Sequence, residues 1–195
     1  MSDGLDSAGR ELLFSEARSV RSFSDKPVPD EVLAELWSLA RWPPTAWNSQ
    51  PLRVTYVRSP EGKARLLPLV DERNRDKTRQ APVTCVLAAD LRFHDHLPEL
   101  FPGKPDLREF LERADREGHA RFNAALQIGY FVLAARAVGL SAGPMAGFDA
   151  GAVAKEFLDP QPLRALLLVN LGYPRPDAAP PRLPRLPAGH VVSWL

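Results

Sequence analysis

The sequence contains a single cysteine, Cys85, which lies inside the apolar run 82–89. One thiol excludes a disulfide within the chain, and its apolar neighbours favour a small buried side chain in a reducing, cytoplasmic protein. The sequence also has almost no excess of charge of one sign, because 25 Lys and Arg against 24 Asp and Glu leave a net charge of +1. Without an overall positive field, nucleic acid is not an expected partner, and any phosphate must be bound by a local cluster of cations.

Long uninterrupted apolar runs are missing as well. The longest apolar segment, 122–140, is broken by Asn123, Gln127 and Arg136, so we interpret it as a core helix and not as a membrane span. The N-terminus has no basic stretch followed by an apolar one, as a secretory signal peptide would have. These absences predict a soluble protein with no membrane association.

The 195 residues are predicted to form one domain over 1–195, with 1–9 flexible and 173–195 an extended arm. Six prolines between Tyr173 and Pro187 exclude a helix there, and we expect the arm to wrap around a partner subunit. The alternation of helices and strands in unequal numbers predicts an α+β fold with a mixed sheet flanked by helices. The expected helices cover 10–17, 29–40, 61–70, 107–116, 120–138 and 152–157, and the expected strands cover 54–57, 82–89 and 163–171.

The segment 120–138 gives the clearest helical signal. It is apolar on most of its circumference and is followed by Gly139, a residue common just after the last turn of a helix. A helix of this kind is predicted to be buried on all sides and to pack against more than one neighbour. The segment 141–149 is rich in small residues and is predicted to be a turn.

Four short segments carry candidate binding residues. Arg18, Ser19 and Arg21 combine guanidinium groups with a hydroxyl and can surround a phosphate, although such a stretch can also be a solvated surface. Asn48 and Gln50 offer amides that can read the donors and acceptors on the edge of a flavin ring, or satisfy the backbone of their own loop. The other candidates are the glycines of 143–149, which allow close approach to a planar ligand, and the tail arginines Arg182 and Arg185.

The histidines offer no metal site. His94-Asp95-His96 resembles a ligand cluster, but no further His or Cys follows at ligand spacing, so no metal is predicted and both histidines are expected to be exposed. His119 and His190 have no acidic partner nearby in the sequence, and neither is assigned a catalytic role.

Taken in order, these segments resemble the family of nitroreductases that depend on flavin mononucleotide (FMN), from about Arg10 to Trp194. Within the family, the sequence is most similar to the branch that contains malonic semialdehyde reductase of pyrimidine breakdown. The stretches that carry the resemblance are Trp42-Pro-Pro-Thr-Ala, Glu61-Gly-Lys, Ala81-Pro-Val-Thr, Leu97-Pro-Glu-Leu-Phe-Pro, Gly139-Leu-Ser-Ala-Gly-Pro-Met-Ala-Gly-Phe-Asp and Arg182-Leu-Pro-Arg-Leu.

The resemblance implies a homodimer with a mainly antiparallel sheet, an arm exchanged between subunits, and FMN as cofactor with NADH or NADPH as co-substrate. No residue is implied as catalytic, because the flavin N5 atom carries the chemistry. Two departures are visible, since Ala17 stands where many relatives have a basic residue and Ala146 replaces an acidic one. The implied cofactor contacts are Arg18, Ser19 and Arg21 with Arg182 and Arg185 at the phosphate, Pro44, Thr45, Asn48 and Gln50 along the ring from the other subunit, and the backbone of Ala146 and Gly147 near N5.

The predicted activity is a ping-pong transfer of hydride from NAD(P)H to a small electrophile. The branch likeness suggests malonic semialdehyde or a related short aldehyde, giving 3-hydroxypropionate. The alternative enzyme is a nitroaromatic or quinone reductase of broad specificity. Two alternatives of other classes are a flavin-binding protein without turnover and a phosphate or nucleic-acid binding module, and the net charge of +1 argues against the second.

Overall fold

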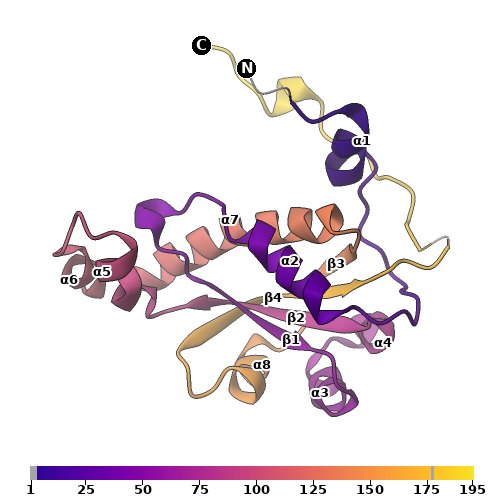
Figure 1. Cartoon of the computed structure of the whole chain (residues 1–195), viewed down its shortest axis with the longest axis horizontal. Helices are drawn as coiled ribbons and strands as arrows, with labels where there is room; N and C mark the ends of the chain where they lie inside the picture. The colour runs from indigo at the N-terminus through magenta and orange to yellow at the C-terminus, as the bar shows by residue number, and fades with distance from the viewer. Residues whose placement is uncertain (1–3, 177) are drawn as a thin grey trace.

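A four-stranded antiparallel sheet with helices on both faces forms the body of the protein, which we describe from a computed structural model (Figure 1). The structure describes residues 4–176 and 178–195, so the first three residues of the N-terminal segment expected to be flexible, and residue 177 of the arm, lie outside the described residues. The strands are β1 (Leu52–Val57), β2 (Val83–Asp90), β3 (Ser141–Met145) and β4 (Leu163–Gly172), in the order β1-β2-β4-β3. This arrangement confirms the predicted α+β fold.

The helices divide between the two faces and one end of the sheet. Figure 1 shows α2 (Asp30–Ala40) and α7 (Arg116–Ala137) on one face, and α3 (Pro60–Leu66) and α8 (Ala150–Phe157) on the other. The remaining helices are α1 (Ser7–Arg10), α4 (Glu72–Gln80), α5 (Leu97–Leu100) and α6 (Leu107–Glu112). Single turns of other helix types are η1 (Glu11–Ser15), η2 (Ala46–Asn48), η3 (Leu67–Leu69), η4 (Phe93–His96) and η5 (Ala188–His190).

The strand β2 has no polar face, because it is central in the sheet and both of its faces are covered. Cys85 and Leu87 face the core shared with α2 and α7, whereas Val86 and Ala88 face the core shared with α3 and α8. All eight residues are buried, so the strand reads in the sequence as a continuous apolar run. Cys85 is the small buried hydrophobe that was predicted, and burial raises the pKa of its thiol above the ordinary value.

Elements without apolar periodicity were not predicted. The helix α4 has the sequence Glu-Arg-Asn-Arg-Asp-Lys-Thr-Arg-Gln and buries only Asn74 and Thr78. Part of the turn predicted at 141–149 is the edge strand β3, which pairs with β4 and tolerates Pro144 because its outer edge has no neighbour in the described chain. The segment around α5 and α6 is more helical than the single helix predicted there.

The prediction that the long helix is buried on all sides is wrong for the single chain. On α7, Phe122, Leu126 and Tyr130 are 68%, 42% and 44% exposed, whereas Phe131 is fully buried against the sheet. The helix begins after Asp115, whose carboxylate accepts from the N–H of Gly118, and ends before Gly139, where φ is +79°. One apolar stripe of α7 is therefore left open by the fold.

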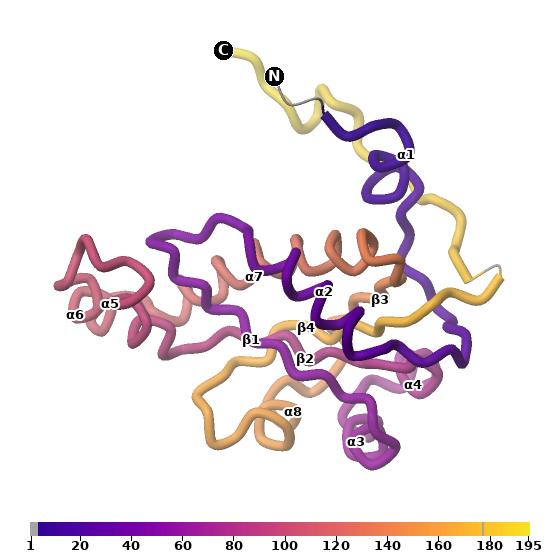
Figure 2. Tube along the Cα trace, viewed as in Figure 1, coloured from indigo at the N-terminus to yellow at the C-terminus, as the bar shows by residue number. Residues whose placement is uncertain are grey.

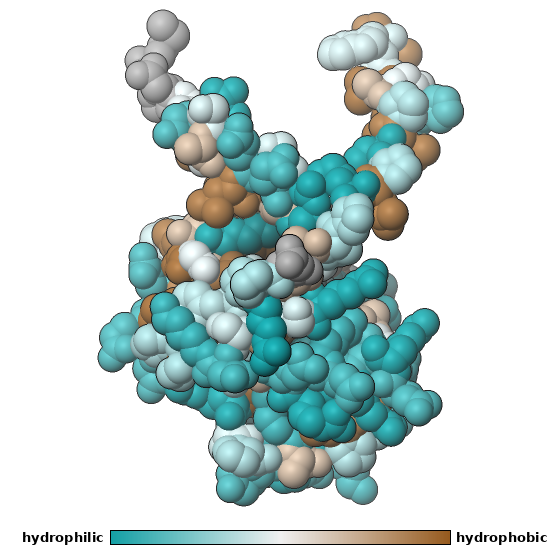
Figure 3. Space-filling model, turned by 90° about the vertical axis from the view of Figure 1, so that its right-hand side faces the viewer, coloured by the Kyte–Doolittle hydropathy of each residue, from teal (hydrophilic) through white to brown (hydrophobic). Residues whose placement is uncertain are grey.

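Both ends of the chain project from the body on the same side. Figure 3 shows the N-terminal segment and the C-terminal arm as two prongs that carry apolar side chains. In the arm, Leu183, Leu186 and Trp194 are 74%, 71% and 92% exposed. No helix of the described residues is both long and apolar enough to cross a membrane.

Candidate functional site

The predicted phosphate residues meet at one pocket of about 320 Å³, which we call the cationic pocket. Arg18, Ser19 and Arg21 enter it from the N-terminal segment, and Arg182 and Arg185 enter from the arm. The structure thus brings together five residues from two segments that are more than 160 positions apart in the sequence. None of the described lining residues is acidic, so the pocket is suited to an anion.

Two cations of the cationic pocket were missed in the sequence. Lys77 comes from α4 and Arg136 comes from the last turn of α7. Lys77 sat in a helix without an apolar signal, and Arg136 was noted only as an interruption of an apolar segment. Their spacing along the chain gives no local sign of a shared site, because three-dimensional packing alone brings them together.

The cations in this pocket are crowded. Burial is the main cause that lowers the pKa of Lys77, and the charges of Arg21 and Arg73 lower it further. Burial, followed by the charge of Arg182, likewise lowers the pKa of Arg136. Like charges disfavour each other's protonated forms at short range, so a bound anion would stabilise this arrangement.

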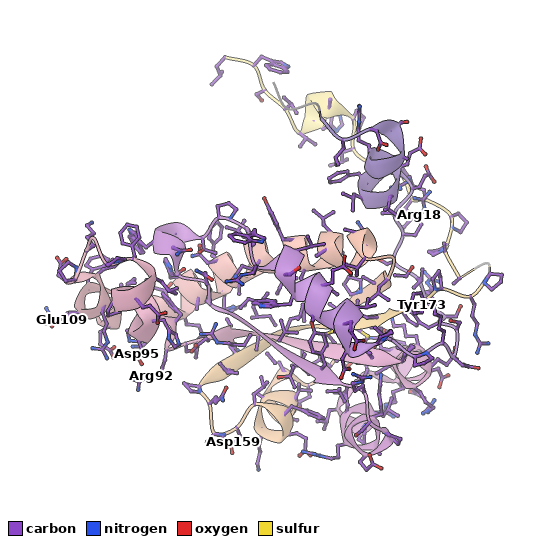
Figure 4. The ribbon with its side chains drawn as sticks, in the orientation of Figure 1. Arg18, Arg92, Asp95, Glu109, Asp159 and Tyr173 are labelled. Carbon is purple, nitrogen blue, oxygen red and sulfur yellow. The ribbon has the colours of Figure 1, made fainter. Side chains whose placement is uncertain are left out.

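Three arginines of the pocket also hold the end of the N-terminal helical segment. Arg136 donates from Nη1 to the carbonyl oxygen of Leu13 at 2.9 Å, and Arg18 donates to that of Ser15 at 3.1 Å. Arg182 donates to the carbonyls of Phe14, Ser15 and Ala17. Cations at unpaired carbonyls near the end of a helical segment are favourable, so these hydrogen bonds hold the segment beside the pocket. Figure 4 labels Arg18 next to this segment.

The two glycines of the β3 region have packing roles within the chain. A Cβ atom on Gly143 would lie 3.0 Å from the carbonyl oxygen of Val20, and one on Gly147 would lie 2.5 Å from Asp71 Oδ2. The carbonyl of Gly147 accepts from Asn74 Nδ2 at 3.1 Å. Contacts of Ala146 and Gly147 with a flavin stay a prediction, which is favoured by the N–H groups of both residues donating to no partner among the described residues.

The loop 44–50 has an unusual backbone. Trp47, Asn48 and Gln50 have φ values of 55°, 52° and 42°, in the left-handed region that costs about 1–3 kcal/mol for each residue other than glycine. The side chain of Asn48 donates to the carbonyl of Leu100 at 3.1 Å, and Gln50 Nε2 donates to Asn48 Oδ1 at 2.8 Å. The backbone N–H of Gln50 donates to Thr45 Oγ1 at 3.2 Å. Asn48 and Pro44 are exposed and Thr45 and Gln50 are half-buried, so this set is open to a ligand or a partner.

Within one chain, the loop 44–50 and the cationic pocket do not meet. Asn123 binds the loop near the beginning of α7, whereas Arg136 lines the pocket at its end. Thirteen residues of helix separate the two positions by about 20 Å. Figure 2 shows the same separation, with the loop between α2 and β1 toward the α5 and α6 end and β3 at the other end. The predicted cofactor residues therefore form two half-sites.

A second polar cluster surrounds His94, and it corrects the prediction that His94 is exposed. Its side chain is fully buried, with Nε2 2.5 Å from Glu112 Oε2 and 3.4 Å from Arg116 Nη1. The partner was missed because Glu112 lies 18 positions further along the chain. His96 is exposed, as predicted. In Figure 4 this cluster lies at the end of the molecule opposite Arg18, where Arg92 and Asp95 are labelled.

His119 occupies the centre of an aromatic stack. Its ring lies 5.2 Å from Trp47 with an interplanar angle of 11°, and 4.9 Å from Phe93 with an angle of 14°. Burial lowers the pKa of His119 below the ordinary value. The stack links the first turns of α7 to the loop 44–50.

Comparisons with known proteins identify the family of the chain. The model of the nitroreductase family matches residues 15–173. A protein of Streptomyces coelicolor is 52% identical over 184 residues, which cover 93% of this chain and 91% of that protein. One of Leptothrix cholodnii is 47% identical over 188 residues, covering 95% of each chain. Both are named, provisionally, as an NADH dehydrogenase/NAD(P)H nitroreductase.

Solved structures share the fold at lower sequence identity. A nitroreductase of Exiguobacterium sibiricum, determined in complex with FMN, superposes with a TM-score of 0.85 at 20% identity and covers 100% of this chain and 99% of its own. A structure described as an NAD(P)H:FMN oxidoreductase of Staphylococcus epidermidis gives a TM-score of 0.82 at 21% identity, covering 100% and 98%.

Proposed function

The chain belongs to the nitroreductase family, and we propose that it is a flavin enzyme that uses FMN to pass hydride from NADH or NADPH to a small electrophile. The observation that carries this proposal is the cationic pocket. Six cations from four parts of the chain surround one cavity, and none of the described lining residues is acidic. A pocket of this composition is a binding site for a phosphate.

The residues present fit the phosphate end of FMN. A phosphate monoester carries a charge of about −1.5 to −2 at neutral pH, which would neutralise part of the crowded cluster. Arg21 would supply a guanidinium group that can bind phosphate oxygens in pairs, Ser19 would supply a hydroxyl, and Arg18 would add charge while it donates to the carbonyl of Ser15. The flavin ring would lie beyond the pocket, where the free N–H groups of Ala146 and Gly147 are available.

We propose further that the protein works as a homodimer, in which the loop 44–50 of one chain faces the cationic pocket of the other. The separation of the two half-sites within one chain supports this arrangement. The open apolar stripe of α7 contains Phe122, Leu126 and Tyr130. Exposed apolar surface of this kind is typical of the interface between two copies of a chain. The exposed apolar residues of the arm, Leu183 and Leu186, would be buried against that partner.

When bound, FMN supplies the hydride chemistry at its N5 atom. The chain's own residues bind and orient it. The cationic pocket would hold the phosphate, and the donors and acceptors that the amides of Asn48 and Gln50 do not use within the loop would be available to the edge of the ring. The left-handed backbone of the loop fixes the direction in which these amides point.

For the electron acceptor, we propose malonic semialdehyde or a related short aldehyde, which would be reduced to 3-hydroxypropionate or the corresponding alcohol. The sequence likeness to the malonic semialdehyde reductase branch supports this choice. A nitroaromatic or quinone acceptor is the second candidate, and the names of the relatives favour it. Turnover of each compound by the purified protein with NADH or NADPH separates them, and reduction of nitroaromatics without the aldehyde would refute the first.

An absorption spectrum of the freshly purified protein tests the cofactor. We expect a yellow protein whose bands bleach when NADH or NADPH is added without oxygen. Yellow protein that does not bleach would indicate a flavin-binding protein without turnover, and colourless protein that takes up no added FMN would refute the proposal. Truncation after Tyr173 is expected to weaken both dimerisation and flavin retention, so a truncated yellow dimer would contradict the role of the arm.

A further inference from the structure

Three polar residues follow one another at four-residue spacing on the buried side of α7. They are His119, Asn123 and Gln127, and the last two are only 2% and 1% exposed. Residues four apart lie above one another on a helix, so the three form a polar ladder. A buried amide is unfavourable unless it is hydrogen-bonded, so the two buried amides of the ladder require hydrogen-bond partners.

The two buried amides of the ladder accept hydrogen bonds from the loop that leads into β1 and from the first residue of that strand. Asn123 Oδ1 accepts from the backbone N–H of Ala46 at 2.8 Å, and Gln127 Oε1 accepts from that of Leu52 at 2.8 Å. Asn123 Nδ2 donates back to the carbonyl of His119 at 2.9 Å, which fixes its amide in one orientation. The ladder therefore binds the backbone on both sides of the strained residues.

The ring of His119 holds the middle of the same loop. It stacks between Trp47 and Phe93, and its Nε2 lies 3.4 Å from Ser49 Oγ. The left-handed conformations begin at Trp47, so the stack acts at the point where the backbone departs from its preferred conformation. Asparagine tolerates the left-handed region, but Trp47 and Gln50 have no such preference and none of the three residues is glycine. The contacts with α7 therefore support the shape of this loop.

We propose that His119, Asn123 and Gln127 are positioning residues: they hold the loop 44–50 in the conformation in which its amide side chains can hydrogen-bond to the flavin ring. The inference rests on the proposed function, since it assumes that Asn48 and Gln50 face FMN. The ladder residues do not touch the cofactor in this account. They determine where the amides of Asn48 and Gln50 lie, and through them the hydrogen bonds at the ring edge.

The test compares wild type with Asn123→Leu and Asn48→Ala. Asn123→Leu leaves the N–H of Ala46 without an acceptor, and we expect FMN to bind about 10-fold to 100-fold more weakly. We also expect the visible absorption bands and the midpoint potential of the bound flavin to change in the direction seen for Asn48→Ala. Phe131→Leu is the matched control, because Phe131 is the next residue of the same face and contacts the core but not the loop. It should lower the melting temperature without changing either flavin property.

A double-mutant cycle decides whether Asn123 acts through the loop. If it does, adding Asn48→Ala to Asn123→Leu has little further effect on FMN affinity, whereas additive losses would overturn the proposal. Should Asn123→Leu not fold, Gln127→Met takes its place in the cycle. His119→Phe, which preserves the stack, should retain FMN binding that His119→Ala loses, and equal loss in both would contradict the positioning role of the ring.

Wild-type binding keeps the two proposals distinguishable. If the wild type binds no FMN, the proposed function fails and the inference fails with it. If the wild type binds FMN and the ladder variants bind it with unchanged affinity and spectrum, only the inference fails.

Discussion

A buried lysine beneath the helix α4 allows a quantitative prediction. Lys63 is 8% exposed, and its Nζ donates to the carbonyl of Thr78 at 2.9 Å and to Thr84 Oγ1. Thr84 in turn donates to Asn170 Oδ1 at 2.7 Å, so the lysine belongs to a network that joins α3 and α4 to the sheet. No carboxylate among the described residues pairs with it. Burial lowers the pKa of Lys63 from 10.5 to about 8.

The lowered pKa gives the sign and size of a pH effect. The unfolded chain keeps the proton of Lys63 up to about pH 10.5, whereas the folded protein releases it near pH 8. Between these values the unfolded state binds more protons, so the free energy of unfolding rises with pH through that window. At about 1.4 kcal/mol per pKa unit, deprotonation of Lys63 adds about 3 kcal/mol to the free energy of unfolding. This gain is absent below pH 8 and complete above pH 10.5.

The perturbation is Lys63→Met, which fills the same space without a charge. Urea unfolding of both proteins between pH 7 and 10.5 gives the free energy of unfolding of each at every pH. Subtracting the value of the variant from that of wild type removes the contributions of the other titrating groups. We expect this difference to rise by about 3 kcal/mol across the window. Lys155→Met, at an exposed position of α8, is the control. A difference that is constant, or that falls with pH, would refute the reasoning.

Three further predictions concern the site. Lys77→Met should weaken FMN binding about 10-fold to 100-fold, because a charge-assisted hydrogen bond contributes about 1.5–3 kcal/mol. The flavin-free variant should be as stable as wild type. A fluorescence titration measures the affinity, and equal weakening by Lys155→Met would contradict this prediction. Gly147→Ala should lower the free energy of unfolding by about 1–3 kcal/mol, because its Cβ would lie 2.6 Å from Nδ2 of Asn74, a buried amide that donates to the carbonyl of Gly147, and chemical denaturation checks it. Because burial lowers the pKa of His119, the free energy of unfolding should fall as the pH drops below 6.5 toward that lowered pKa. His119→Phe should remove this part of the acid sensitivity, which urea unfolding at a series of pH values measures.

The elements that could be predicted from the sequence are those whose burial leaves a periodic pattern. The helix α2 was predicted from Val32, Leu33, Leu36, Leu39 and Ala40. Of these, Leu33, Leu36 and Ala40 are buried in the structure, whereas Leu39 is exposed. The strands β2 and β4 were predicted from apolar runs. The helix α4 could not be predicted, because it covers the sheet with Asn74 and Thr78 and exposes charged residues elsewhere. A polar helix carries no hydrophobic period to detect.

The candidate site shows the same limit. Arg18, Ser19 and Arg21 are neighbours in the sequence, so their common chemistry was visible there. Lys77 and Arg136 join them only through packing, and no alternation or spacing marks that contact. The family resemblance implied that the loop 44–50 reaches the cofactor from the other subunit, and within the single chain this loop and the cationic pocket lie near opposite ends of α7.

The contacts of α7 explain why its sequence predicted a helix buried on all sides. Its 22 residues extend over about 33 Å, and its circumference serves four different neighbours. Phe131 packs on the sheet, Asn123 holds the loop, Tyr130 lies on the open apolar stripe, and Arg136 reaches the cationic pocket. A helix with only one buried face would show a clear polar side. In the proposed dimer, each α7 would position the loop of one flavin site and contribute a cation to the other, so the apolar residues around its circumference reflect two interfaces, only one of which lies within the chain.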